Sequence, residues 1–177
     1  MGASGSKSVT VTDWDTLKFS WWENEQSSIN NSTDVGWKLE LIATSYGRID
    51  TTNTRGWNVT LAGKSYSGYV SVDIENNQTK TLASDVTTVF HDADGKKTFS
   101  YSFSQDFTGI TFSSTALGKV SGSGSGTLTP INGGGNGLVY IDNGTSFEAY
   151  QVFIDNGTSW DQYIPYIDNG SSWDQYG

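Results

Sequence analysis

The chain has 177 residues, of which 14% are aromatic and only 16% are charged, with 21 glycines and no cysteine. This composition argues against a helical protein and against a disordered one, because helix formers are few and there is much aromatic surface to bury. The formal net charge of -9 argues against a nucleic-acid partner, since phosphate binding needs the opposite sign.

The amino-terminal residues 1–8, Met-Gly-Ala-Ser-Gly-Ser-Lys-Ser, are predicted to be a flexible segment. They lack the basic and apolar regions of a signal peptide. Nowhere in the chain do about 18 apolar residues run together, so membrane insertion is not expected. A protein of this kind that works outside a cell would get there by lysis or as part of a particle.

Residues 9–131 alternate apolar and polar positions in short runs separated by turn signals, which predicts an antiparallel β-sandwich. In this interpretation most of the tryptophans before residue 60 belong to the core. Trp21 and Trp22 are neighbours, so on a strand one ring faces inward and the other outward. The runs whose inward positions are clearest contain Leu17, Phe19 and Trp21; Trp37, Leu39, Leu41 and Ala43; Trp57, Val59 and Leu61; Val70, Val72 and Ile74; and Phe99, Tyr101 and Phe103.

The last predicted strand, within residues 118–131, has the centre Ser-Gly-Ser-Gly-Ser-Gly, which offers few side chains for packing. Glycine at such positions indicates a bulge or a close approach of another chain segment. Residues 132–137, Asn-Gly-Gly-Gly-Asn-Gly, carry no apolar side chain and are predicted to be a flexible linker between domains.

Residues 138–177 contain one motif three times with a period of 13 residues. Each copy has Asp-Asn-Gly between two runs of β-branched and aromatic residues, which predicts a short hairpin. A lone two-stranded hairpin is marginal in water, so the three repeats are expected to pack on one another, on the body or on a partner. The recurring positions are Asp142, Asp155 and Asp168; Phe147, Trp160 and Trp173; and Tyr150, Tyr163 and Tyr176.

Several segments of the chain resemble structural proteins of siphoviruses, a group of tailed phages, that infect Gram-positive bacteria. The segments are Gly56-Trp-Asn-Val, Gly63-Lys-Ser-Tyr-Ser-Gly68, the run from Thr88 to Phe103, the run from Gly118 to Leu128, and the last repeat from Pro165 to Tyr176. The resemblance implies a tail or tail-tip component in the virion, with an immunoglobulin-like or jelly-roll-like sandwich. It also implies other virion tail proteins, or further copies of the chain, as partners.

The single histidine, His91, stands beside Asp92 and Asp94, so an acid/base or metal site is one interpretation of this segment. The preferred interpretation is a hairpin turn, in which short acidic side chains bond local backbone amides. A calcium loop would need further oxygen ligands, where this chain has Lys96 and Lys97. No nucleophilic triad is present and no pair of carboxylates is singled out by spacing, so no catalytic residue, metal or cofactor is predicted.

The nine repeat residues named above are the candidate ligand-binding site. Their rings could form a ladder on which sugar rings stack, with the aspartates holding hydroxyls, or they could pack between hairpins or between copies of the chain. The sequence therefore predicts a non-enzymatic tail or tail-tip protein of the virion that could face the host and is released on host lysis. The alternative is a carbohydrate-binding module that recognises cell-wall polysaccharide, and a glycan-cleaving enzyme is a distant third.

Overall fold

The computed structural model describes residues 2–28, 30–49, 51, 53–92, 94–131, 138–142, 147–155, 160–163, 166–168 and 173–175, and from residue 138 onward it describes the backbone pairing alone. Every regular element in these ranges is a β-strand, which confirms the all-β prediction. The described residues contain no helix long and apolar enough to cross a membrane. Contacts divide the chain into two compact units, one made of residues 1–24, 34–89 and 98–128 and the other of residues 25–33, 90–97 and 129–177.

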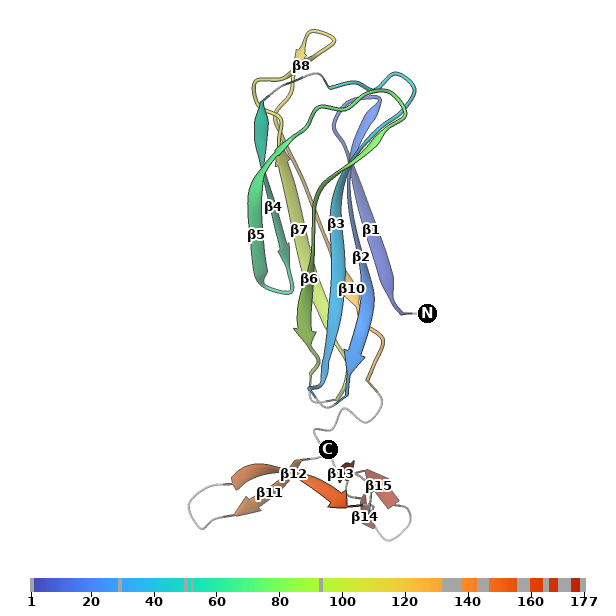
Figure 1. Ribbon diagram of the computed structural model, residues 1–177, viewed down its shortest axis with the longest axis vertical. Helices are drawn as coiled ribbons and strands as arrows, with labels where there is room; N and C mark the ends of the chain where they lie inside the picture. Colours follow the sequence, from blue (N-terminus) through green and yellow to red (C-terminus); the bar gives the residue numbers. More distant parts are fainter. Residues whose placement is uncertain are drawn as a thin grey trace. The chain divides into compact units, whose positions relative to one another are not determined.

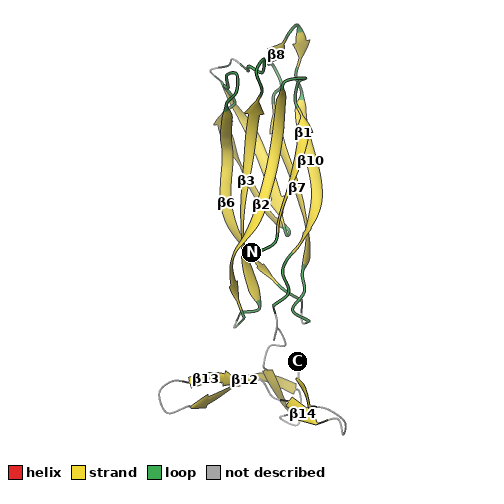
Figure 2. Ribbon diagram, turned by 90° about the vertical axis from the view of Figure 1, so that its right-hand side faces the viewer, coloured by secondary structure: helices red, strands yellow, loops and turns green. Residues whose placement is uncertain are grey.

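Two four-stranded antiparallel sheets face each other and form the sandwich (Figures 1 and 2). The first sheet has the order β1-β2-β3-β6, with β1 Ser4–Thr10, β2 Asp15–Ser27, β3 Ser32–Ala43 and β6 Thr79–Phe90. The second has the order β10-β7-β4-β5, with β10 Lys119–Thr127, β7 Thr98–Asp106, β4 Thr54–Leu61 and β5 Lys64–Ser71. A two-residue-per-strand hairpin of β8 (Thr111–Phe112) and β9 (Thr115–Ala116) lies between β7 and β10 in the chain.

Aromatic rings from both sheets meet in the middle of the sandwich. Phe19 of β2 lies 4.9 Å from Tyr101 and 5.4 Å from Phe103 of β7, measured between ring centroids. Trp37 of β3 lies 5.0 Å from Tyr66 of β5 and 6.3 Å from Trp57 of β4. The apolar positions that the alternation assigned to the inner faces of β2, β3 and β7 are all buried. The hydrophobic pattern therefore predicted the core of these three strands correctly.

Glycines lie opposite aromatic rings throughout this sandwich. In β10, Gly122, Gly124 and Gly126 are the cross-strand partners of Phe103, Tyr101 and Phe99. A Cβ atom built on any of these three glycines would approach a ring atom of its partner to 2.6 Å or less. The rings of β7 thus cover the backbone of β10, an arrangement that stabilises glycine within strands. The same relation recurs where Gly5 pairs with Trp21 and Gly68 pairs with Trp57.

The β7–β10 ladder is unbroken from Lys119 to Thr127, so the glycines mark a close approach of rings and not a bulge. The prediction that this strand would pack poorly is wrong, because the neighbouring strand supplies the missing bulk.

The amino-terminal strand differs from the prediction of a flexible segment at residues 1–8. Residues from Ser4 onward form β1, which pairs with β2 from Ser4 opposite Trp22 to Thr10 opposite Thr16. Most side chains of β1 are exposed, so this edge strand is held mainly by backbone hydrogen bonds to β2. For the same reason its sequence shows no alternation of apolar residues that would predict a strand.

The carboxy-terminal repeats form hairpins, as predicted. The strands β11 (Leu138–Asp142), β12 (Phe147–Asp155) and β13 (Trp160–Tyr163) make a three-stranded sheet, and β14 (Tyr166–Asp168) pairs with β15 (Trp173–Gln175). The predicted linker, residues 132–137, lies outside the described residues. The second compact unit begins after residue 128 in this part of the chain and also takes in residues 25–33 and 90–97.

Candidate functional site

The three hairpins of the repeats share one backbone register. An aspartate and an aromatic residue are the last paired positions before the loop of each hairpin, and they face each other across the ladder. These partners are Asp142 with Phe147, Asp155 with Trp160, and Asp168 with Trp173. The structure therefore brings the predicted acidic and aromatic positions together pairwise, three times over.

The repeat tyrosines occupy a second recurrent position, three pairs further from the loop. Tyr150 is paired with Val139, and Tyr163 is paired with Val152. Tyr176 lies outside the described residues. Each repeat thus offers an aromatic residue and a carboxylate at the loop end of a hairpin, a combination that can serve either sugar binding or protein contact.

The junctions between repeats differ. β12 is the second strand of the first hairpin and continues through Gln151 as the first strand of the second hairpin. The position that corresponds to Gln151 between the second and third repeats is Ile164, and the next residue, Pro165, stands where the second repeat has Val152 and has no N–H to donate to a ladder. In keeping with this, β13 and β14 belong to different sheets.

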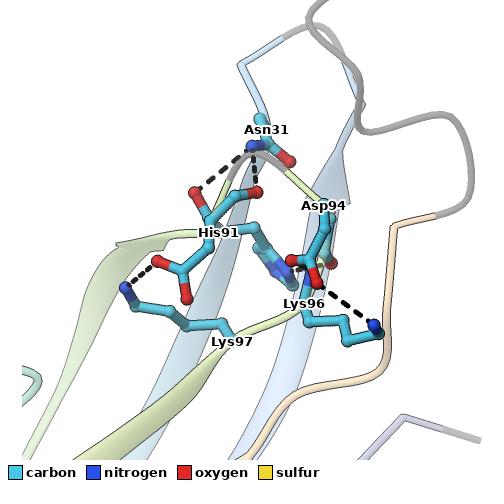
Figure 3. Close-up of polar contacts among 7 residues, drawn as sticks. Asn31, His91, Asp94, Lys96 and Lys97 are labelled. Atoms are coloured by element: carbon cyan, nitrogen blue, oxygen red, sulfur yellow. Dashed lines mark hydrogen bonds and ion pairs between the residues drawn. The ribbon is translucent and has the colours of Figure 1, made fainter. Parts of the chain in front are cut away.

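His91 is buried within the turn that follows β6 (Figure 3). Its Nδ1 lies 2.7 Å from the carbonyl oxygen of Gly95, which can only accept, so Nδ1 carries the proton. Its Nε2 lies 2.7 Å from the hydroxyl of Thr33, which donates to it when the ring is neutral. Asn31, with a φ of 47°, donates from Nδ2 to the carbonyl oxygens of His91 and Asp92. Both ring nitrogens are therefore engaged, one with the turn after β6 and the other with the start of β3.

The acidic side chains beside His91 are paired with lysines of the same turn (Figure 3). Asp94 accepts from the backbone N–H and the ammonium group of Lys96, and these bonds lower the pKa of its carboxyl group. Asp92 accepts from Nζ of Lys97 at 2.7 Å. Among the described residues no cluster of three or more potential metal ligands is found. The segment is built as a turn, and its carboxylates are neutralised locally.

Trp22, the outward ring of the adjacent tryptophan pair, is half-buried against the outer face of the first sheet. A Cβ atom at Gly36 would lie 2.5 Å from its ring, and its Nε1 donates to the side chain of Asn24 at 2.7 Å. The ring covers backbone and is held in place, whereas Trp21 is buried in the core. Trp14 is an exception to the prediction that the body tryptophans are mostly core, since it lies in a turn between β1 and β2 and is 42% exposed.

A polar groove on the outer face of the second sheet was not predicted from the sequence. It has a volume of about 500 Å³ and is lined by two rows of small side chains. One row is Asn58, Ser104 and Ser121, and the other is Thr60, Ser102 and Ser123, with each row running across β4, β7 and β10. Lys119 stands at one side. The groove offers hydroxyl groups for hydrogen bonding, but no exposed ring lies among the residues that line it.

No protein-family model, curated protein or solved structure matches this chain. The resemblance to phage tail proteins accordingly stays a prediction from the sequence.

Proposed function

We propose that this chain is a non-enzymatic structural protein of a phage tail, carried in the virion, whose three carboxy-terminal hairpins attach it to a partner surface. The observation that carries the proposal is the shared register of the hairpins, each with the same aspartate–aromatic pair at its loop. Three equivalent sites on one chain add their binding through effective concentration, so weak single contacts suffice for stable attachment.

Assembly within the tail is the preferred role of these hairpins. Small two-stranded units bury little surface alone, and aromatic residues contribute large areas when they are packed against a partner. Further copies of the chain or neighbouring tail proteins would supply that surface.

The surroundings of His91 support a role without catalysis. A general base must be reached by its substrate, and both His91 and its hydroxyl partner Thr33 are buried, at 7% and 0% exposed. The neighbouring carboxylates are paired with lysines.

A carbohydrate-binding module is the second candidate, favoured by the pairing of a carboxylate with an aromatic residue in each hairpin. Sugar rings present an apolar face and a rim of hydroxyls, which these two residue types complement. In this case the repeats would grip wall polysaccharide of a Gram-positive host.

The test compares the full chain with a variant in which Phe147, Trp160 and Trp173 are replaced by alanine. Tyr69→Ala is the matched control, because Tyr69 is an exposed ring of the sandwich, with 81% of its surface accessible. The mass of each protein in solution is measured by light scattering, and its retention on purified Gram-positive cell walls by sedimentation.

Self-association that is lost only in the triple variant supports assembly through the hairpins. Wall binding that is lost only in the triple variant supports the carbohydrate-binding alternative. If the wild type self-associates or binds walls and the triple variant does so equally well, the hairpins do not attach the protein and the proposal is wrong.

A further inference from the structure

A pocket of about 350 Å³ lies between the turn that joins β1 to β2 and the small β8–β9 hairpin. Both segments are at the same end of the sandwich (Figure 1). The turn contributes Thr12, Asp13 and Trp14, and the hairpin side contributes Phe112, Ser113 and Leu117. Half-buried apolar side chains and exposed polar ones thus converge on one small space, which is the usual composition of a ligand site.

The turn that carries Asp13 and Trp14 is held rigidly by its own hydrogen bonds. The hydroxyl of Thr12 accepts from the backbone N–H groups of Trp14 and Asp15 and donates to the carboxylate of Asp15 at 2.7 Å. The backbone N–H groups of Val11 and Thr12 both donate to the carbonyl of Asp15. A site whose side chains are fixed before binding loses little conformational entropy when a ligand arrives.

Trp14 is supported from the neighbouring loop. Its carbonyl accepts hydrogen bonds from the backbone N–H and the hydroxyl of Thr44, at 2.9 and 3.0 Å. Its ring makes an edge-to-face contact with Tyr46, with centroids 5.0 Å apart. The contact orients the Trp14 ring and still leaves 42% of the residue exposed. A large aromatic surface is thus held in place and left open to solvent.

The hairpin on the other side of the pocket contains strained backbone. Its turn residues Ser113 and Ser114 have φ values of 44° and 70°, a conformation that side chains other than glycine and asparagine rarely adopt. Such strain costs about 1 kcal/mol or more per residue and is concentrated at ligand clamps and active sites. Ser113 itself lines the pocket.

We propose that this pocket binds a neutral pyranose sugar, as a single residue or as the end of a glycan chain. The exposed ring of Trp14, together with Phe112 across the pocket, suits the apolar face of a sugar ring. The carboxylate of Asp13 accepts hydrogen bonds from sugar hydroxyls, and the hydroxyl of Ser113 both donates and accepts. The volume lies at the lower end of the range of about 300–1,000 Å³ for ligand pockets, which favours a small ligand.

The lining selects against other classes of ligand. It contains no lysine or arginine, and Asp13 and the net charge of -9 would repel a phosphate or an acidic sugar. A metal ion would find one carboxylate in this lining, fewer than a cation site needs. The groove on the outer sheet face has hydroxyls but lacks the exposed ring.

This inference stands apart from the proposed role of the repeats, since every residue in it belongs to the sandwich. The test therefore uses the full chain carrying the Phe147, Trp160 and Trp173 to alanine changes, so that sugar binding by the hairpins does not contribute. The probes are the methyl glycosides of glucose, galactose and rhamnose, and N-acetylglucosamine. Glucose 6-phosphate serves as the anionic comparison. Binding is followed by NMR of the isotope-labelled indole N–H groups.

The expected result is a saturable shift of the Trp14 indole signal with at least one neutral sugar, and a smaller one with glucose 6-phosphate. Trp14→Ala, in which binding is followed on the signals of the sugar because the reporting indole is gone, should weaken binding about tenfold or more, and Asp13→Asn or Phe112→Ala should weaken it severalfold. Tyr69→Ala, which removes an exposed ring elsewhere on the sandwich, should leave the affinity unchanged. If Trp14→Ala does not fold, Asp13→Asn and Phe112→Ala provide the same test.

The proposal is overturned if no sugar of the panel shifts the Trp14 signal at about 100 mM, far above a millimolar dissociation constant. It is also overturned if the Asp13 and Phe112 variants bind as well as the parent, because the sugar would then be bound elsewhere.

Discussion

Replacing Gly126 with alanine should destabilise the sandwich, because the added methyl group meets two rings that hold each other in place. The Cβ atom would lie 2.5 Å from Cζ2 of Trp21 and 2.6 Å from Cζ of Phe99. Both rings are 4% exposed, and they contact each other edge to face with centroids 5.0 Å apart. Neither ring can move away from the methyl group without disturbing the other.

The expected size of the effect follows from two opposing contributions. Overpacking of a well-filled core costs about 1–3 kcal/mol. Alanine loses less backbone entropy than glycine on folding, which returns about 0.5–1 kcal/mol. The free energy of unfolding should therefore fall by up to about 2.5 kcal/mol, the largest difference of these terms.

Gly118→Ala is the matched control, because no atom lies within 4 Å of a Cβ atom at this position and its φ is not in the left-handed region. This variant should be unchanged or more stable by up to about 1 kcal/mol. Denaturant unfolding followed by tryptophan fluorescence measures both, as a shift in midpoint at constant slope. If Gly126→Ala is as stable as Gly118→Ala, the rings adapt freely and the packing argument is wrong.

Three further changes test other parts of the structure. Changing Ser113 to Asn and Ser114 to Gly together should raise the thermal midpoint, because the two new residues tolerate positive φ; an unchanged midpoint would show that the serines are not strained. Burial raises the pKa of Asp15, so the folded protein holds more protons than the unfolded chain and loses stability as pH rises above about 4; Asp15→Asn should lose less over the same range, which parallel urea titrations at several pH values would detect. His91→Ala should lower the free energy of unfolding by about 1–3 kcal/mol, since the buried Thr33 hydroxyl loses its partner and the Gly95 carbonyl keeps only the N–H of Ile131, and equal urea midpoints would contradict this.

The parts of the fold that could be predicted are those whose side chains alternate. The alternation of apolar residues predicts β2 from Leu17, Phe19 and Trp21. The same period predicts the buried face of β7. β1 could not be predicted in this way, because an edge strand held through its backbone leaves its side chains free to be polar. The β8–β9 hairpin was also missed, because its turn is Ser-Ser where the expected turn signal would contain glycine or asparagine.

Of the candidate sites, the one with a regular sequence pattern was predicted and the one without such a pattern was not. The period of 13 residues was enough to predict that every repeat would fold alike, and the common register of the three hairpins agrees with it. The pocket beside Trp14 was not predicted, since a tryptophan among strand-like residues is usually core. The sequence feature that could have indicated it is the set of short polar residues beside Trp14 in the chain, which favour a turn: Thr12, Asp13 and Asp15.

The glycines of β10 explain why composition alone was misleading about packing. Judged by itself, Ser-Gly-Ser-Gly-Ser-Gly has no side chains for a core, yet its glycines lie opposite Phe103, Tyr101 and Phe99. Because side chains alternate along a strand, a shift of the pairing by one residue would place serines against those rings and turn the glycines outward. The aromatic residues of one strand and the glycines of the next therefore fix the register of this edge together. The many glycines and the many aromatic residues of this sandwich are therefore connected, because rings cover glycines on neighbouring strands. The connection can be recognised only once the pairing of the strands is known.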